Sequence, residues 1–480
     1  MKTLGRREFL RAAAVACGGA ALAACQPTVV EVEREVEKIV EREVPVEVEV
    51  EKVVEVEREV VRAAEAQPVV RFTGFFGVGD IQDDLQPVLD EFERESGIRL
   101  AAETTAGDDR AKMQAMLANI AAGTAQDLHR SWGPHMRALI ERDIMMNLTP
   151  FIEIDYTDEF QDFSPAQLSS AVLDGHQYGL PQYNGCWAFT YNKDMFDEAG
   201  LEYPTADWGP EDVLAASEKM TTRDSGGRPL TFGIRDGFSF EFTVSTVIWS
   251  WGAEVHDPED NRISRLREPL ALEAMQWLAD LRWRHQVAPT PAEADSVEMP
   301  GAGNVFRMGL CGITAEGSWG INGLFNQAGD RFAWDVIPHF RGPTGHRETF
   351  ATTDMWLMWE GTRHPEAAWE ALKFLTGYEY QRLQIRQGFL QPARLSLSPE
   401  WLDTISAKAV EVNPKLEGVD FSVFTEAYRY ARPMVFYAQH SEAREILSPE
   451  LDKVFVLGTA KAEEVIPQAC EQITDMMLSS

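Results

Sequence analysis

Residues 69–123 read VVRFTGFFGVGDIQDDLQPVLDEFERESGIRLAAETTAGDDRAKMQAMLANIAAG, and they determine the class of fold. Val69–Phe72 has the composition of a strand, and the glycine-rich turn 74–80 follows it. A helix is predicted over 85–95, with Gly97 as a left-handed cap. A second strand over 98–102 and a second helix from Asp108 to Ala122 come next. Strands that alternate with helices at this spacing predict an α/β sheet.

Length and charge limit what the chain can be. It has 480 residues and a formal net charge of −33. Such acidity argues against nucleic acid or anionic lipid as a partner, because both are polyanions. The chain from residue 69 onward is about 410 residues long, which exceeds what one hydrophobic core normally serves. We therefore expect two lobes, and the soluble part is expected to be a monomer.

The first 24 residues are predicted to be a signal peptide. Residues 5–11 read GRREFLR, a twin-arginine pattern, and a short apolar stretch follows from Ala12 to Ala24. It is too short to span a bilayer as a helix. Small residues precede Cys25 in the sequence Leu-Ala-Ala-Cys, which resembles the lipobox of bacterial lipoproteins. The sequence therefore predicts lipidation at Cys25, and so anchoring to the outer face of the cytoplasmic membrane in the cell envelope (periplasmic or extracellular).

Residues 25–68 are predicted to connect this anchor to the folded part. Residues 31–61 consist almost entirely of Val, Glu, Lys and Arg. The valines fit a broken heptad spacing, which would indicate a coiled coil, but Pro45 interrupts the register. An extended, charged tether is the preferred interpretation, and a self-associating helix is the alternative.

The sequence lacks the common motifs of enzymes and metal sites. The nine histidines are scattered and no HExxH occurs. No Walker loop is present, and Gln82 stands where a dinucleotide-binding loop beginning at Gly77 would need its third glycine. Cys186, Cys311 and Cys470 remain outside the signal peptide and lipobox, an odd number that favours buried free thiols over a disulfide framework. We expect no enzyme activity, no cofactor and no metal, and no membrane span after the signal peptide.

Eight segments together resemble the extracellular solute-binding family that includes maltose-binding protein. Two stand closest to the family pattern: DGHQYGLP at 174–181 and FTYNKDMFDEAGL at 189–201. Gln126 replaces the family's proline, and Cys311 replaces its usual alanine. The other segments are ANIAAGTAQDL at 118–128, NLTPF at 147–151, DWGPED at 207–212, FRMGLCGI with GSW at 306–313 and 317–319, HPEAAWEALKFLT at 364–376, and QPAR at 391–394.

This resemblance implies an α/β, two-lobe periplasmic-binding-protein fold, in which each lobe is a mixed sheet flanked by helices. One lobe should comprise 69–181 plus 354–390, and the other 182–353 plus 391–480. Hinge strands should join them near 180–184, 352–355 and 389–394. The implied function is a substrate-binding receptor of a bacterial ABC-type importer, which delivers its ligand to the transmembrane permease subunits.

A sugar presents apolar C–H faces and a rim of hydroxyls, so its receptor needs aromatic rings and short polar groups. The loops that the resemblance places at the cleft are rich in tryptophan, which favours a sugar or oligosaccharide as the ligand. A receptor for a polyol or glycerol phosphate, and a carbohydrate-active enzyme, remain alternatives. The candidate ligand-binding residues are Phe76, Asp80, Trp132, Tyr183, Asn184, Trp187, Trp249, Trp251, Glu316, Trp319, Asp354, Trp356 and Arg394. Trp249 and Trp251 would share a face if their segment were extended.

Overall fold

The computed structural model describes most of the chain from residue 67 to residue 479. The described ranges are 67–73, 82–103, 109–235, 239–297, 304–352, 354–388, 390–434 and 436–479. The predicted signal peptide, Cys25 and nearly all of the tether therefore lie outside the described residues. Pro68–Ser480 forms one compact unit.

The first sheet has the strand order β2-β1-β3-β13-β6. Strand β1 pairs in parallel with β2 and β3, whereas β13 runs antiparallel to β3 and β6. Its strands are β1 (Val69–Thr73), β2 (Arg99–Glu103), β3 (Leu128–Ser131), β6 (Gly179–Pro181) and β13 (Met355–Met358). Trp356 and Met358 point into one core and Met355 and Leu357 into another, as the two-residue period of a strand requires. We call the part built on this sheet the first lobe.

The second sheet has the order β11-β7-β10-β9-β8 and carries the second lobe. Strand β10 pairs antiparallel with β7 and parallel with β9, so this sheet is mixed as well. Its strands are β7 (Trp187–Asn192), β8 (Thr222–Arg223), β9 (Pro229–Arg235), β10 (Cys311–Gly317) and β11 (Trp334–Ile337). Phe189 and Tyr191 enter the core on one face, and Ala188 enters the core on the other. Both sheets are therefore covered on two faces, and the predicted fold class is confirmed.

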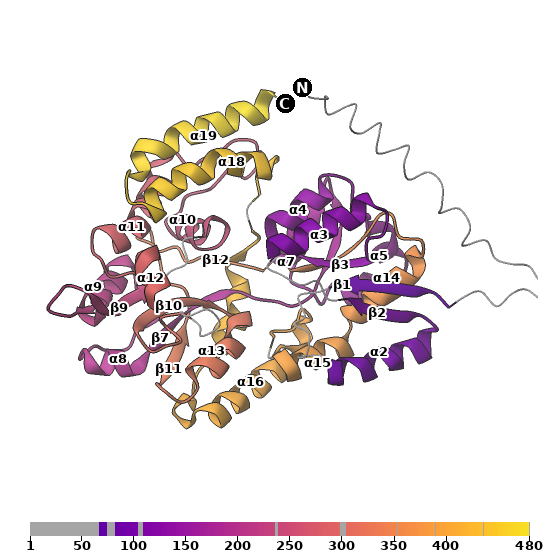
Figure 1. The fold of residues 1–480 in the computed structure, drawn as a ribbon, viewed down its shortest axis with the longest axis horizontal. Helices are drawn as coiled ribbons and strands as arrows, with labels where there is room; N and C mark the ends of the chain where they lie inside the picture. Colours follow the sequence, from indigo (N-terminus) through magenta and orange to yellow (C-terminus); the bar gives the residue numbers. More distant parts are fainter. Residues whose placement is uncertain are drawn as a thin grey trace, which may run out of the picture. The chain divides into compact units, whose positions relative to one another are not determined.

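Helices surround both sheets (Figure 1). Those of the first half are α2 (Gln82–Ser96), α3 (Asp109–Ala121), α4 (Gly133–Ile140), α5 (Thr149–Asp155), α6 (Thr157–Phe160), α7 (Pro165–Leu168), α8 (Lys193–Glu198), α9 (Pro210–Met220) and α10 (Ser245–Ser250). Those of the second half are α11 (Pro269–Trp283), α12 (Pro291–Val297), α13 (Ile321–Ala328), α14 (Pro365–Leu375), α15 (Tyr378–Gly388), α16 (Ser398–Val412), α17 (Ser422–Glu426), α18 (His440–Leu451) and α19 (Ala462–Ser479). Two π-helices, η2 (Phe240–Val244) and η7 (Asp452–Val456), adjoin α10 and α18.

Short pairings complete the secondary structure. Strand β12 (Thr349–Phe350) pairs with β14 (Ala431–Arg432), and β4 (Val172–Leu173) pairs with β5 (His176–Gln177). Helices α18 and α19 pack side by side, and α18 also contacts α4 (Figure 1). Since α4 follows a strand of the first sheet and α18 packs in the core of the second, this contact joins the lobes. Among the described residues, no helix is long and apolar enough to cross a membrane.

Local sequence explains several helix ends. Gly97 and Gly123 follow α2 and α3 with φ of 71° and 67°, values that glycine adopts without a side-chain clash. The Ser448-Pro449 pair looks like the start of a helix, but Pro449 lies inside α18, close to its end. The chain continues there into the π-helix η7. The segment of Trp249 and Trp251 is not extended, because α10 includes Trp249 and ends next to Trp251, so the condition under which the two would share a face is not met.

Three chain segments cross between the lobes and are joined by backbone hydrogen bonds. The amide of Gln182 donates to Asp354 O at 3.0 Å, and that of Asn184 donates to Gln391 O at 2.9 Å. Isolated bridges join Tyr183 to Pro392 and Cys186 to Ala351. These are the segments for which the sequence predicted the hinge. Cys186, Cys311 and Cys470 are buried free thiols, as expected.

Candidate functional site

Five aromatic side chains from separate segments form what we call the aromatic cluster: Trp132, Trp187, Phe242, Trp319 and Phe350. The Phe242 ring stacks on Trp132 with centroids 5.7 Å apart, and on Trp187 at 5.9 Å. Phe350 lies 5.2 Å from Trp187, 4.9 Å from Phe242 and 5.9 Å from Trp319. Phe350 is fully buried and the other four are partly buried, so the cluster reaches solvent.

Each lobe contributes to the aromatic cluster. Trp132 comes from the first lobe, where it directly follows β3 and is the N-cap residue of α4. Gly133 after it has φ of 50°, and Pro134 occupies the first helical turn, so the backbone turns sharply at this tryptophan. Trp187 begins β7 of the second lobe, and Phe242 belongs to η2. The stack of Trp132 on Phe242 therefore spans the two lobes.

Two glycines, Gly185 and Gly317, leave the space in which the Trp319 ring packs against the crossing segment. A methyl carbon added at Gly185 would lie 2.7 Å from the Trp319 ring, and one added at Gly317 would lie 2.4 Å from it. Real carbon atoms do not approach so closely, so only glycine permits this ring position. Trp319 itself lies in a short 3₁₀ helix between β10 and α13.

A polar network occupies the crossing segments beside the cluster. Asp354 accepts from Arg130 at 2.9 Å and from the Tyr183 hydroxyl at 3.0 Å. The Arg130 guanidinium also lies 5.6 Å from the centre of the Tyr183 ring. Burial, and then the Asp354 carboxylate, raises the pKa of Tyr183 well above its ordinary value, so the hydroxyl keeps its proton and donates. The network joins β3 of the first lobe to two of the crossing segments.

Glu316 is the buried carboxylate closest in sequence to Trp319. It pairs with Arg307 at 3.1 Å, and its side chain is mostly shielded from solvent. Burial raises the pKa of Glu316 above its ordinary value, although Arg307 opposes that change. Among the described residues, no group of three or more His, Cys, Asp or Glu side chains could hold a metal ion.

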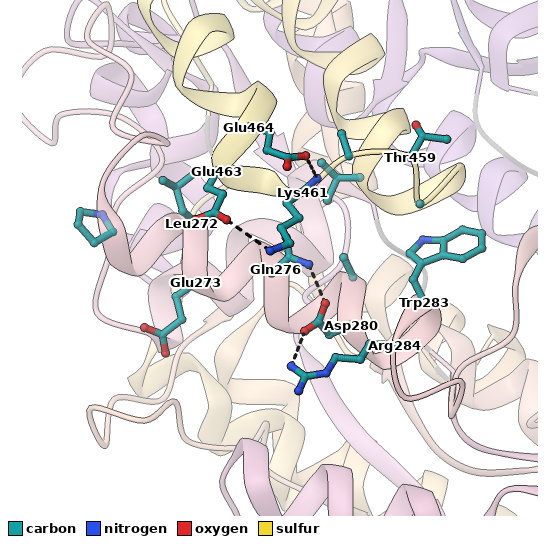
Figure 2. Close-up of a pocket in the computed structure, with 15 residues that line it drawn as sticks. Leu272, Glu273, Gln276, Asp280, Trp283, Arg284, Thr459, Lys461, Glu463 and Glu464 are labelled. Atoms are coloured by element: carbon teal, nitrogen blue, oxygen red, sulfur yellow. Dashed lines mark hydrogen bonds and ion pairs between the residues drawn. The ribbon is translucent and has the colours of Figure 1, made fainter.

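A separate hollow of about 890 Å³ lies between α11 and the η7–α19 connection. Figure 2 shows polar side chains of its wall paired with one another: Gln276 donates to Asp280 at 2.6 Å, and Lys461 lies 3.6 Å from Glu463. Trp283 lines the same hollow and packs against Gly458. Every lining residue falls within 269–284 or 454–464. A ligand bound there would not touch the first lobe.

Comparisons with known proteins agree with this architecture. The sequence profile of the bacterial extracellular solute-binding protein family matches residues 79–382, which is more than half of the chain. The chain belongs to that family.

Several relatives and solved structures are similar to the solute-binding protein. A protein of Brucella abortus (strain 2308), described only as a binding protein, is 27% identical over 392 residues, which are 80% of this chain and 87% of the relative. The ABC substrate-binding protein Lmo0181 from Listeria monocytogenes, solved in complex with cycloalternan, superposes with a TM-score of 0.71 at 22% identity, over 86% of this chain and 99% of that one. Maltose-bound MalE3 of T. maritima superposes with a TM-score of 0.64 at 18% identity, over 85% and 99%. At these identities the structural matches establish the fold.

The sequence-predicted site residues divide into four groups in the solute-binding protein. Trp132, Trp187 and Trp319 meet in the aromatic cluster. Tyr183, Asp354 and Glu316 lie in the polar pairs described above, where protein groups already engage them. Phe76 and Asp80 lie outside the described residues.

The remaining candidates lie in the interior, where the protein's own groups surround them. Trp356 is 0% exposed and packs edge-on against Phe72, and Asn184 is 0% exposed and donates to Ala393 O. Trp249 lies under the Arg432 guanidinium, and Trp251 donates to Glu273. Trp249 belongs to α10 and Trp251 caps its end, and both are buried in the core of the second lobe.

Arg394 is enclosed in the same way, because it is 1% exposed. Its guanidinium donates to Thr376 O at 2.9 Å, and to Glu159 O and the Tyr156 hydroxyl. The same group lies 4.3 Å from the centre of the Phe163 ring. These contacts all lie within the protein, and the guanidinium is not available to a ligand.

Two members of the aromatic cluster were not predicted from the sequence. Phe242 and Phe350 lie outside the family-like motifs, and a phenylalanine in an apolar segment is usually a core residue. Their positions depend on contacts with rings 31 to 163 residues away in the chain, which local sequence does not specify. The high content of aromatic residues is the one signal in the sequence that could have indicated these two phenylalanines.

Proposed function

We propose that this solute-binding protein is the sugar- or oligosaccharide-binding receptor of an ABC-type importer, and that it holds its ligand at the aromatic cluster between two closing lobes. The observation that carries this proposal is the stack of Trp132 from one lobe on Phe242 from the other. Rings gathered from both lobes at a partly exposed place match the apolar faces of a sugar. The ligands named for the structural relatives above, cycloalternan and maltose, support the same class.

The polar pairs beside the cluster suit the hydroxyl rim of a sugar. The Arg307–Glu316 pair supplies charged donors and acceptors next to Trp319, and charge-assisted hydrogen bonds are the stronger kind. Asp354 is engaged by Arg130 and Tyr183, so we assign it to holding the crossing segments. In this assignment the rings supply most of the contact area, and Glu316 contributes to orientation.

Closure about the crossing segments is the proposed mechanism. A ligand that contacts both lobes favours the conformation in which those contacts form together. Cys25 lipidation would keep the receptor at the outer face of the membrane, where a permease could receive the ligand. Both the anchor and the permease are inferred from the signal sequence and from the family.

A thermal-shift screen tests the function directly. Residues 68–480, which form one compact unit, are mixed with mono- and oligosaccharides, polyols and glycerol phosphate. A ligand at about 100 times its Kd adds roughly 2.7 kcal/mol of stability. A shift with one sugar class, with the sugar recovered unchanged, is expected. A shift only with glycerol phosphate would contradict the sugar assignment, and hydrolysis of the sugar would contradict a pure receptor.

Trp132→Ala is expected to weaken binding of that sugar by about 2 kcal/mol, roughly thirtyfold in Kd, because it removes the first-lobe ring. Isothermal titration calorimetry measures the change. Trp283→Ala is the matched control, since Trp283 is a partly buried tryptophan of the hollow in Figure 2 and should leave Kd unchanged. If Trp283→Ala weakened binding and Trp132→Ala did not, the ligand site would be that hollow and not the aromatic cluster.

A further inference from the structure

The hollow shown in Figure 2 has the size of a small-molecule site. Its volume of about 890 Å³ lies within the range of roughly 300–1,000 Å³ that such sites occupy. Helix α11 forms one wall, and α11 contacts both η7 and α19, which frame the other wall. Because both walls belong to the second lobe, a ligand can enter this hollow without closure of the two lobes.

One side of α11 gives the hollow an apolar lining. Leu272, Ala279 and Trp283 are spaced seven and four residues apart, so they lie along the same side of the helix. Val454 and Ala460 line the opposite wall. The apolar part of a ligand would therefore contact both walls at once, and its burial there would favour binding.

Trp283 is held in a fixed position at the edge of this hollow. Its indole nitrogen donates to Phe455 O at 3.3 Å. The backbone at Gly458 lies so close to the ring that a methyl carbon added there would be 2.4 Å from it. A ring that is already fixed loses little conformational entropy when a ligand contacts it. The ring of Trp283 is only partly buried, and the face of a tryptophan ring attracts cations.

The charged groups of the hollow are mostly acidic. Four carboxylates and two cationic groups line it: Glu273, Asp280, Glu463, Glu464, Arg284 and Lys461. Each cationic group is paired with one of these carboxylates, Arg284 with Asp280 at 3.5 Å and Lys461 with Glu463 at 3.6 Å. The remaining charge at the hollow is therefore negative, and it favours a positively charged ligand.

The remaining two carboxylates, Glu273 and Glu464, form no ion pair with any described residue. Glu273 accepts from Trp251 Nε1 at 3.3 Å, and Glu464 accepts from the backbone amide of Lys461 at 2.9 Å. All four carboxylates thus already have a protein group beside them. A primary ammonium group needs acceptors for three N–H donors. A cation whose nitrogen carries only carbon substituents needs none, so it suits this hollow better.

We propose that this hollow is a second ligand site, separate from the aromatic cluster, and that it binds a small quaternary ammonium compound. The carbon substituents of the ligand pack between α11 and the η7–α19 connection, and its positive charge lies near the Trp283 ring and the unpaired Glu273 and Glu464. Since such a ligand touches only the second lobe, it binds whether or not the aromatic cluster is occupied. The inference does not depend on the proposed function.

Thermal-shift titrations with benzyltrimethylammonium at constant ionic strength test the proposal. The unfolding midpoint of the unaltered protein should rise to saturation with this cation. Phenylacetate, which has a similar ring and a negative charge, should bind at least about tenfold more weakly. Trp283→Ala should weaken binding of the cation about tenfold. Trp132→Ala, which removes a ring of the aromatic cluster, should leave it unchanged.

A second pair of substitutions tests the charge and does not rely on the fold of Trp283→Ala. Glu273→Gln combined with Glu464→Gln removes the unpaired charges and keeps an acceptor at each position, so it should weaken binding of the cation about fivefold. Both residues are exposed, and both variants should fold. The matched control combines Glu379→Gln with Glu426→Gln, which changes the net charge equally at exposed residues outside the hollow. This control should leave binding unchanged.

Several results would overturn the proposal. One is the absence of a saturable shift with the unaltered protein, and another is equal binding of phenylacetate. Equal weakening by the two glutamate pairs would show that only the net charge of the protein attracts the cation. Weaker binding by Trp132→Ala and not by Trp283→Ala would place the cation at the aromatic cluster. None of these results decides whether the protein binds a sugar, because the sugar screen described above measures that separately.

Discussion

Arg394→Met is expected to lower the free energy of unfolding by about 3–5 kcal/mol, the largest loss that we expect from one substitution in this chain. The guanidinium donates to Thr376 O, Glu159 O and the Tyr156 hydroxyl in a site that excludes water. Methionine fills similar space but donates to none of these acceptors. The Tyr156 hydroxyl keeps its hydrogen bond with Thr376 Oγ1 and Glu159 O keeps that from Asp162 N, but all three charge-assisted bonds from the guanidinium are lost. Urea denaturation followed by circular dichroism measures the loss.

Arg429→Met is the control for this change. The Arg429 side chain is 79% exposed and pairs with Glu426 one helical turn away, a kind of contact that contributes little. Its loss should change the unfolding midpoint only slightly. If the two substitutions had equal effects, Arg394 would not be the structural arginine that its contacts indicate, and a place in the ligand site would again have to be considered.

Stability is expected to fall as the pH drops from 6.5 to 4, because of two buried histidines. Burial lowers the pKa of His129 to about 4, and likewise that of His339, from an ordinary value of 6.5. Their folded-state pKa lies below the unfolded value, so the unfolded chain takes up protons first. The stability contributed by each neutral histidine is complete above pH 6.5 and is lost as the pH falls to 4. The loss is about 3 kcal/mol for each.

Unfolding midpoints measured at intervals between pH 7 and pH 4.5 check this expectation. His339→Gln and His129→Gln should each make the free energy of unfolding less dependent on pH. Each should reduce the number of protons taken up on unfolding by about one. His364→Gln is the control, because His364 lies exposed at the start of α14. An unchanged pH dependence in both buried variants would show that other groups cause the acid loss.

The sequence predicted the first part of the fold well, and the reasons are local. Strand β1, helix α2 and the cap at Gly97 follow from apolar spacing and from the backbone freedom of glycine. Pro449 led to a wrong prediction, because the Ser448-Pro449 pair has the same local sequence whether a helix begins there or is already under way. The two cases differ in whether the residues before the proline form helical turns that pack against the rest of the protein. In α18 those turns pack against α19.

The candidate site was predictable in part. Trp132, Trp187 and Trp319, which meet in the aromatic cluster, were predicted because each lies in or near a family-like motif in the sequence. Arg394 adjoins such a motif too, yet its guanidinium turns toward α5 and α6 of the first lobe. Sequence position places a backbone in a region, but side-chain direction depends on partners that are distant in the chain. Phe242 went unnoticed for the same reason.

The buried thiols of Cys186, Cys311 and Cys470 bear on how the protein is made. All three are enclosed, and burial raises the pKa of Cys186 far above its ordinary value, which keeps this sulfur in its unreactive thiol form. The described fold therefore depends on no oxidative cross-link. A chain of this kind can reach its final form in the reducing cytoplasm. Folding before translocation is what the Arg6-Arg7 pair predicts. In an oxidising environment after translocation, the burial of these three thiols would protect them from oxidation.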